Sequence, residues 1–459
     1  MAAVSAYFEK QGIPAVVEVA DLPNVKKIAQ DTFLTEAVPA MRAVFIPPVR
    51  WTEKVAEQDL PKFLEALTKP LTDAEKKSGK YLPPAAPRIA MTGTYDEIQD
   101  FFTGDLSVFV DTPPTAKWTD GLPVTPPTAE AVARMLKGTS HKPDEIVHPA
   151  VGPQKRPVTV EKVAINAVMA GCKPEQLPVV LAITQGGLTA PFSSAAAFGF
   201  FNIVSGPIVK EIGMNTSVAL MSPGNPANAA ISRFTALALR NLSGYTPGIN
   251  NITGYGSTFT GLTIAESPDT PWEGLNVRYG ASAKESVILQ LSGKVSAHGH
   301  GIGETTIISD KPEAPQRLIS AAKAYVPTAG TFGKVFIVTP NIARKWKAKF
   351  GWDSMAKLQD YLWDNATWPR KNYDLSYWWG TRAPFKAAVE ALKAPRGSRV
   401  LNMDHFDAAP DTLVPINPSP LFFPIVVAGG GVPDYHDLQN EFGWGVFGGY
   451  TVLSIDKWK

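Results

Sequence analysis

The sequence predicts an α/β protein of several domains, with parallel or mixed sheets, an N-terminal half of a Rossmann-like fold and a proline-rich arm. A single hydrophobic core rarely supports a chain as long as these 459 residues, so two or three domains are expected. Apolar residues make up 44% of the chain and charged residues 19%, a balance typical of globular proteins. Short apolar runs alternate with helical patterns and are separated by 41 prolines and 37 glycines, which favours short elements joined by long connections.

The segment 1–50 is expected to alternate helix and strand. Residues 2–11 favour a short helix, and 13–19 a buried strand. A second helix near 24–36 leads to another strand over 42–46, which two prolines close. Two parallel strands with two helices cannot cover both faces of a sheet or satisfy both of its edges. We therefore expect either later strands of this chain or a partner chain to complete the sheet.

Three further units are expected to follow. Residues 51–157 are dense in proline and short polar helices, which favours an arm that wraps another surface over a set of ordinary loops. In this arm Thr128 is predicted to cap a helix that Gly138 ends. Residues 158–330 are predicted to form a central α/β domain that carries the candidate site, and 331–459 a C-terminal α/β domain.

The only cysteine, Cys172, lies at a Gly-Cys-Lys-Pro break between two apolar helices. Thr159 is predicted to cap the first helix, and Pro174 to begin the second. A helix N-terminus and the neighbouring charge of Lys173 would lower the pKa of the thiol. This pattern predicts Cys172 as a nucleophile, with Lys173 and Glu175 beside it. The alternative is a small side chain that only packs in a core.

Composition excludes several classes of protein. A single cysteine excludes an intrachain disulfide framework, a cysteine-rich zinc site and an iron–sulfur cluster held by this chain alone. The net charge is +2 and the basic residues are scattered, which argues against nucleic-acid binding. Glu9 and Lys10 interrupt what would be a signal segment, and the apolar runs are too short to span a bilayer. A cytoplasmic protein is therefore expected.

A second candidate feature is the Ser-Pro-Gly-Asn-Pro-Ala-Asn turn that begins at Ser222 and precedes a helix. Backbone amides at such a turn bind carboxylates or phosphates, so an anionic part of a substrate is expected to bind there. The predicted binding residues are Gly224, Asn225, Asn228 and Arg233. The turn is neither a Walker A loop nor a GxGxxG dinucleotide fingerprint. Asparagines that only hold the backbone of the turn are the alternative.

A buried strand near the C-terminus opens onto three glycines, and ligands of open α/β sheets often bind at such turns. Gly429, Gly430 and His436 are therefore predicted to contact the substrate, although the glycine spacing argues against a pyrophosphate cradle.

His298 and His300 are two residues apart, so on a strand they would share a face and could bind a metal ion. Glu304 and Asp310 are the nearest acidic ligands in the sequence. Hydrogen bonding by two histidines in a glycine-rich loop is the alternative. No other cofactor is indicated.

Several stretches together resemble one family. They are TVEKVAINAVMAGCKPEQLPVVLA, SGPIVKEIGMNTSVALMSPGNPANAAISR, AESPDTPWEGLNV and PIVVAGGG, scattered over most of the chain. They resemble the large UGSC-type (seleno)protein family, which is named for a selenocysteine or cysteine followed by Gly-Ser-Cys in an N-terminal α/β segment. The family's activity is poorly defined, so the resemblance implies an architecture more than a reaction.

This chain departs from the family because it contains no Cys-Gly-Ser-Cys. Its start, YFEKQGIPAVV, resembles the part of the family that follows the motif. The resemblance therefore implies that a separate small subunit carries the cysteine motif and that this chain is the large subunit. A divergent homologue that has lost the motif is the alternative.

Three functions follow from these features. The first is the large subunit of a heteromeric cytoplasmic enzyme, a lyase, hydrolase or reductase that acts on a small organic molecule through a thiol. The second is a metal-assisted hydrolase or lyase built on His298 and His300. The third is a non-catalytic scaffold subunit that positions the active site of a partner.

Overall fold

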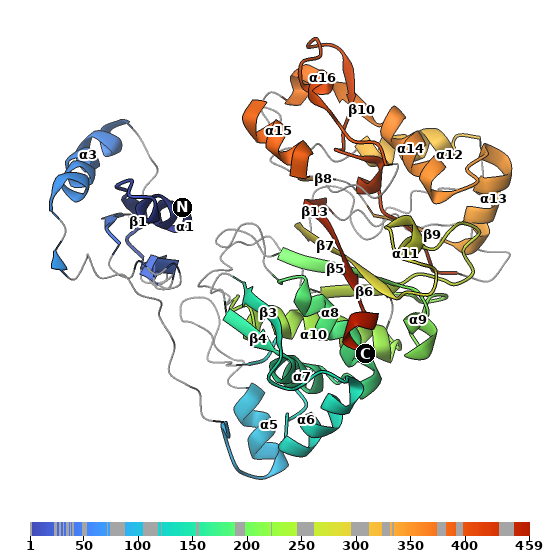
Figure 1. Ribbon diagram of the computed structural model, residues 1–459, viewed down its shortest axis with the longest axis horizontal. Helices are drawn as coiled ribbons and strands as arrows, with labels where there is room; N and C mark the ends of the chain where they lie inside the picture. Colours follow the sequence, from blue (N-terminus) through green and yellow to red (C-terminus); the bar gives the residue numbers. More distant parts are fainter. Residues whose placement is uncertain are drawn as a thin grey trace.

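The computed structural model describes residues 2–22, 25–26, 29–30, 32–33, 36, 38, 41–47, 53–70, 72–73, 88–103, 118–120, 122–152, 156–188, 198–221, 223–245, 261–294, 312–323, 331–332, 335–373, 382–391, 398–430 and 445–459. Helices and several small parallel and mixed sheets alternate along the chain, which confirms the predicted α/β character (Figure 1).

The described helices are α1 (Ala2–Lys10), α3 (Glu53–Thr68), α5 (Tyr95–Thr103), α6 (Ala129–Met135), α7 (Val160–Met169), α8 (Leu177–Gln185), α9 (Ile208–Glu211), α10 (Pro226–Asn241), α11 (Leu275–Arg278), α12 (Ala314–Lys323), α13 (Pro340–Phe350), α14 (Met355–Asn365), α15 (Arg382–Ala391) and α16 (Met403–Phe406). Short 3-10 turns are η1 (Leu136–Gly138), η2 (Pro174–Gln176), η3 (Arg370–Tyr373), η4 (Pro420–Phe422) and η5 (Asp456–Trp458). The strands are β1 (Val17–Ala20), β2 (Ala43–Ile46), β3 (Ile146–Val151), β4 (Arg156–Thr159), β5 (Phe198–Ser205), β6 (Gly261–Ala265), β7 (Val287–Lys294), β8 (Thr331–Phe332), β9 (Phe336–Val338), β10 (Thr367–Pro369), β11 (Leu413–Pro415), β12 (Ile425–Val427) and β13 (Gly445–Ser454).

The N-terminal part forms the predicted parallel pair of strands. β1 and β2 pair in parallel with Val17 opposite Ala43. The first strand is shorter than expected and begins at Val17, because residues 13–16 have no regular secondary structure and join no ladder. Described positions between 25 and 33 are helical and bury Ala29 and Phe33 against Val17 and Val19. The pattern of alternating helix and strand is therefore correct, and the boundary of the first strand is not.

The central sheet has five strands in the order β6-β5-β7-β13-β8. β5 is parallel to β6, whereas β7 is antiparallel to both β5 and β13. The sheet thus contains strands from both sides of residue 330, the expected boundary between the central and C-terminal domains.

Both faces of this sheet are buried, as the alternating side chains of β5 require. Phe200 and Val204 point into a core that contains α7, α8 and α10. Phe201 and Ile203 point into the opposite core, which contains α12, α13 and α14. The sheet is therefore a central layer between two layers of helices (Figure 1).

A separate pair of parallel strands lies beside the carboxyl end of β6 in the central sheet. β9 and β12 are parallel and begin with Phe336 opposite Ile425. The Ser267 amide, just after β6, donates to the Val427 carbonyl at the end of β12 over 2.7 Å. The carboxyl ends of β6 and β12 therefore meet, and β5 ends beside β6.

Candidate functional site

Cys172 belongs to the cap of a helix. Thr159 caps α7 as predicted, with its hydroxyl accepting from the Lys162 amide. At the other end Gly171 has φ +81°, its amide donates to Val168, and the Cys172 amide donates to the Ala167 carbonyl over 2.9 Å. These two bonds form a Schellman motif, in which the residue after the left-handed glycine turns its side chain back toward the helix.

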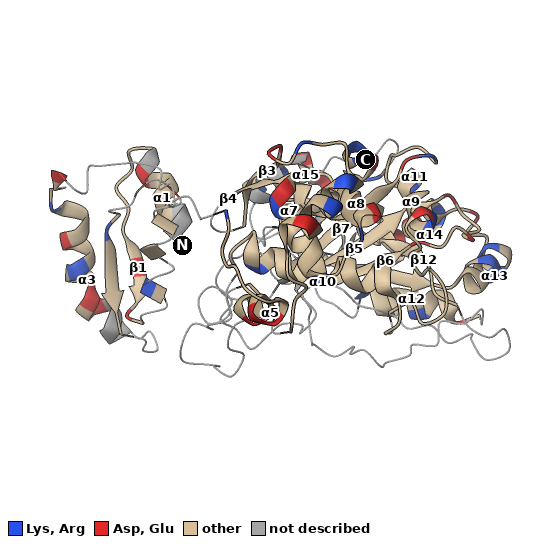
Figure 2. Cartoon of the chain, turned by 90° about the horizontal axis from the view of Figure 1, so that it is seen from below, with Lys and Arg blue, Asp and Glu red and all other residues tan. Residues whose placement is uncertain are grey.

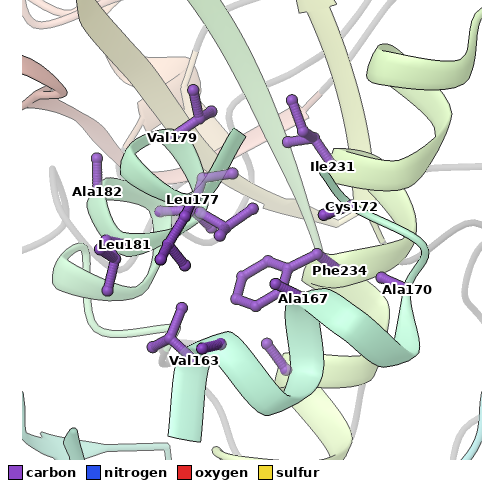
Figure 3. Packing of buried hydrophobic residues seen from close by; sticks show 14 of the residues in the cluster. Val163, Ala167, Ala170, Cys172, Leu177, Val179, Leu181, Ala182, Ile231 and Phe234 are labelled. Atoms are coloured by element: carbon purple, nitrogen blue, oxygen red, sulfur yellow. The ribbon is translucent and has the colours of Figure 1, made fainter. Parts of the chain in front are cut away.

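The Cys172 thiol therefore points into the core and not toward a site. Figure 3 shows it among apolar side chains of α7 and α10, and its exposed fraction is only 9%. Burial raises the pKa of the Cys172 thiol to about 12. The expectation that the helix N-terminus and Lys173 lower this pKa is wrong, because desolvation of the thiolate outweighs them.

The two expected neighbours of the thiol lie on the surface. Lys173 and Glu175 are exposed, and the Lys173 amide donates to the Gln176 side chain where η2 begins. A cationic or acidic group is therefore not turned toward Cys172 from this segment. The three residues predicted as catalytic are neighbours in sequence, but the thiol lies in the core and the two charges lie in solvent.

The turn at Gly224 is held by its asparagines. Asn215 donates from its side chain to Asn225 over 2.7 Å, and Asn225 donates to the Ala219 carbonyl over 2.7 Å. The Asn228 side chain accepts from the Asn215 amide and donates to the Asn215 carbonyl. Gly224 has φ +99°, which favours glycine. These contacts agree with the alternative in which the asparagines fix the backbone of the turn.

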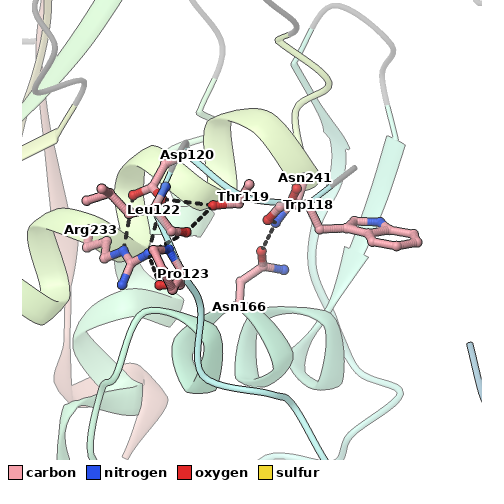
Figure 4. A network of polar contacts seen from close by, with 8 residues as sticks. All are labelled: Trp118, Thr119, Asp120, Leu122, Pro123, Asn166, Arg233 and Asn241. Carbon is pink, nitrogen blue, oxygen red and sulfur yellow. Dashed lines mark hydrogen bonds and ion pairs between the residues drawn. The ribbon is translucent and has the colours of Figure 1, made fainter. Parts of the chain in front are cut away.

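Arg233 contacts the segment that precedes α6. Its guanidinium forms a two-point ion pair with Asp120 at 3.1 Å and also donates to the carbonyls of Leu122 and Pro123 (Figure 4). Nearby, Asn241 donates to the Trp118 carbonyl. Arg233 therefore holds Asp120, Leu122 and Pro123 against α10, and it forms no hydrogen bond with the described residues of the Gly224 turn.

The structure does bring the two predicted glycine turns close to each other. The Gly429 amide donates to the Thr216 carbonyl over 2.9 Å, and Thr216 follows Asn215, which binds the Gly224 turn. A Cβ atom at Gly430 would lie 3.1 Å from the Ser217 hydroxyl. Residues 215–217 thus connect Asn225 and Asn228 to Gly429 and Gly430.

A buried carboxyl group lies at the same edge of the sheets and was missed by the sequence reasoning. Glu266 follows β6 directly, and its carboxylate accepts the Ser205 hydroxyl at 2.6 Å. The Leu275 amide donates to both carboxylate oxygens, and the Asn276 amide donates to Ser205. An acidic residue directly after a strand, where parallel strands end, was the available signal.

Glu266 is suited to exchange a proton near neutral pH. Burial raises the pKa of Glu266 to about 7, although the hydrogen bonds from Ser205 and Leu275 oppose this shift. Such a carboxyl group is a candidate general acid or base. The candidate site is therefore the carboxyl edge formed by the ends of β5, β6 and β12, with the Gly224 and Gly430 turns beside it.

The other residues predicted for a site lie outside the part of the chain that the structure describes. His298, His300 and His436 lie outside the described residues, as do Glu304 and Asp310. Within the described part of the chain no three His, Cys, Asp or Glu side chains come together as a metal site would require. Across the same residues, no helix combines the length and apolar character needed to cross a bilayer.

No protein-family model, curated protein or solved structure matches the chain.

Proposed function

We propose that this chain is the large subunit of a heteromeric cytoplasmic enzyme that acts on a small organic molecule through a thiol of its partner. The main support for this proposal is the pair of strands in the N-terminal part. Among the described residues β1 and β2 pair only with each other, and two strands cannot form a stable parallel sheet alone. A partner chain that adds further strands would complete the sheet.

Exposed apolar side chains support a partner in this region. Half of the large apolar side chains that are exposed in the described part of the chain precede residue 70. They are Tyr7, Phe8, Ile13, Leu22, Phe45, Leu60, Leu64 and Leu67. They belong to α1, β2, α3 and the segments between them, and this number of exposed apolar side chains in one part of the chain favours contact with another chain there.

The partner is also the better source of the thiol. A nucleophilic cysteine acts as its thiolate, and the buried Cys172, with its pKa of about 12, is almost entirely protonated at neutral pH. The resemblance to the UGSC-type family implies a Cys-Gly-Ser-Cys motif on a separate small subunit. The large subunit would then bind the substrate at the carboxyl edge, where Glu266 can donate or accept a proton.

The test is to express the chain together with a small chain that carries Cys-Gly-Ser-Cys and is encoded beside it. Native mass spectrometry should detect a stable complex of the two chains. Turnover by the complex should be lost when the motif cysteines become serine and retained in the matched variant Cys172→Ser. A homogeneous large chain that is active alone would refute the proposal, and activity of the small chain alone would leave this chain as a scaffold.

A further inference from the structure

We infer that Asn202 of β5 is a positioning residue for the site at the carboxyl edge, and that it acts through α10 on the segment that connects the Gly224 and Gly430 turns. This inference rests on the proposed function, because it takes the carboxyl edge as the place where the substrate binds. It follows from a chain of buried hydrogen bonds that runs from the interior of the central sheet to this edge.

Asn202 is a buried polar side chain on an apolar face of β5. It is 0% exposed, and the neighbouring residues on the same face, Phe200 and Val204, belong to the apolar core around α7, α8 and α10. The Asn202 side-chain amide donates to the Thr235 hydroxyl over 3.2 Å and to the Thr263 hydroxyl over 3.4 Å. Asn202 therefore links β5 to both α10 and β6 at one point.

The side-chain oxygen of Asn202 is paired as well. It accepts from the Gln290 side chain on β7 over 3.3 Å. A buried polar group that is satisfied in this way adds little net stability, because the free energy lost on leaving water offsets most of the gain from its hydrogen bonds. Hydrogen bonds are directional, whereas apolar contacts are not, so Asn202 specifies how α10 is placed on the sheet.

A polar stripe on α10 continues the chain of hydrogen bonds toward the site. Asn228, Ser232 and Thr235 are spaced by four and three residues, so they lie on one face of the helix. α10 lies beside β6 (Figure 2), and the Thr263 amide of β6 donates to the Ser232 hydroxyl over 2.9 Å. The Ser232 hydroxyl in turn donates to the Asn228 carbonyl over 2.7 Å. Ser232 and Thr235 together therefore fix the rotation of α10 and its position along β6.

The first turn of α10 transmits this position to the site. Asn228 is 4% exposed, and its side chain accepts from the Asn215 amide over 2.9 Å and donates to the Asn215 carbonyl over 3.1 Å. The carbonyl of the next residue, Thr216, accepts from the Gly429 amide over 2.9 Å. A displacement of α10 along β6 would therefore move residues 215–217 relative to the end of β12.

Asn202 acts on the site only through other residues. None of its hydrogen-bond partners among the described residues belongs to either turn. A displacement of about 1 Å in a group that positions a substrate can lower a rate about 100-fold. Asn202→Leu keeps the approximate size of the side chain and removes its hydrogen bonds, so α10 keeps its apolar packing and loses its directional contacts.

Hydrogen exchange in the full chain tests the coupling. In Asn202→Leu the Asn215 and Gly429 amides should exchange at least about tenfold faster, relative to the slowest amides of the chain, which report global unfolding. Thr235→Val should act in the same direction, whereas the matched variant Thr235→Ser keeps the hydroxyl and should stay within about twofold of the wild type. Ile203→Val, on the opposite face of β5, should leave this ratio unchanged. Equal ratios in Asn202→Leu and Ile203→Val would overturn the inference.

Turnover by the complex with the small Cys-Gly-Ser-Cys chain then separates the inference from the proposed function. Asn202→Leu should lower kcat/KM at least about tenfold, and Thr235→Ser should leave it within about twofold. Faster exchange with an unchanged kcat/KM would overturn the inference, because α10 would then position a segment that the substrate does not use. A wild-type complex without turnover would refute the proposed function, and the exchange rates would still decide whether Asn202 positions residues 215–217.

Discussion

The buried carboxyl group of Glu266 makes the stability of the protein depend on pH, and Glu266→Gln should remove that dependence. Burial raises the pKa of Glu266 from 4.5 to about 7 in the folded chain. A group with a raised pKa stabilises the fold fully below its unfolded pKa, and this contribution is lost as the pH rises through the folded value. The loss should therefore fall between about pH 4.5 and pH 7.

The magnitude follows from the difference between the two pKa values. That difference is about 2.5, and each pKa unit corresponds to about 1.4 kcal/mol, so the expected loss is about 3 kcal/mol. Glutamine has the shape of the protonated acid and can still accept from the Leu275 amide. The free energy of unfolding of the Gln variant should therefore lack this component, while all other titrations remain common to both proteins.

The assay is urea unfolding followed by tryptophan fluorescence at about pH 4.5 and about pH 8. The wild-type protein should lose about 3 kcal/mol more than Glu266→Gln between the two conditions. Ser205→Ala removes a hydroxyl that stabilises the ionised form, so it should raise the pKa of Glu266 and enlarge the loss. Equal changes in the wild-type and Gln proteins would refute the assignment of a near-neutral pKa to this carboxyl group.

Three other variants test the contacts of residues that lie outside the candidate site. Cys172 should resist a water-soluble thiol reagent in the folded protein and react after denaturation, because its side chain is buried. Cys172→Ala should lower the free energy of unfolding by about 1 kcal/mol. Labelling of the folded chain at the rate of a free thiol would contradict the burial of Cys172. Gly171→Ala should lower stability by about 1 kcal/mol in thermal unfolding, because no atom lies within 4 Å of the added methyl group and only its φ of +81° is unfavourable; an unchanged melting temperature would argue against the Schellman cap. Arg233→Ala should lower the free energy of unfolding by about 1–2 kcal/mol, because the guanidinium binds Asp120 and the Pro123 carbonyl. The same variant should speed amide hydrogen exchange at Leu122 and Val124. Unchanged exchange would show that other contacts hold this segment.

Local signals in the sequence predicted the local structure well. Thr128 and Thr159 cap helices as expected, because a hydroxyl in this position accepts an amide that the first turn leaves free. Gly171 ends α7, because its φ of +81° is accessible to glycine at little cost. The parallel pairing of β1 and β2 is also confirmed.

The orientation of side chains was harder to predict. Sequence spacing placed Cys172 at a helix start, but the Schellman motif that precedes this helix decides where the thiol points. Similarly, Arg233 lies close in sequence to the Gly224 turn, yet Asp120, 113 residues away, determines its contacts. Helical periodicity gives the face of a residue and not the distant partner that packs there.

Contacts between residues far apart in the sequence also connect the Gly224 and Gly430 turns. Such contacts determine the position of Glu266 as well. Neither can be derived from one segment, because Ser205, Glu266 and Val427 come together only through the sheet arrangement. An acidic residue after a parallel strand is the signal that would have identified Glu266.

The place of β13 has a consequence for how the chain is made. Gly445 of β13 pairs with Lys294 of β7, 151 residues earlier in the chain (445 − 294). At about 5–20 residues per second, translation leaves that side of β7 without β13 for roughly eight to thirty seconds. An uncovered strand edge invites pairing with other chains, so newly made protein should depend on a chaperone during this interval. Folding yield, more than final stability, should then respond to the rate of translation between β7 and β13.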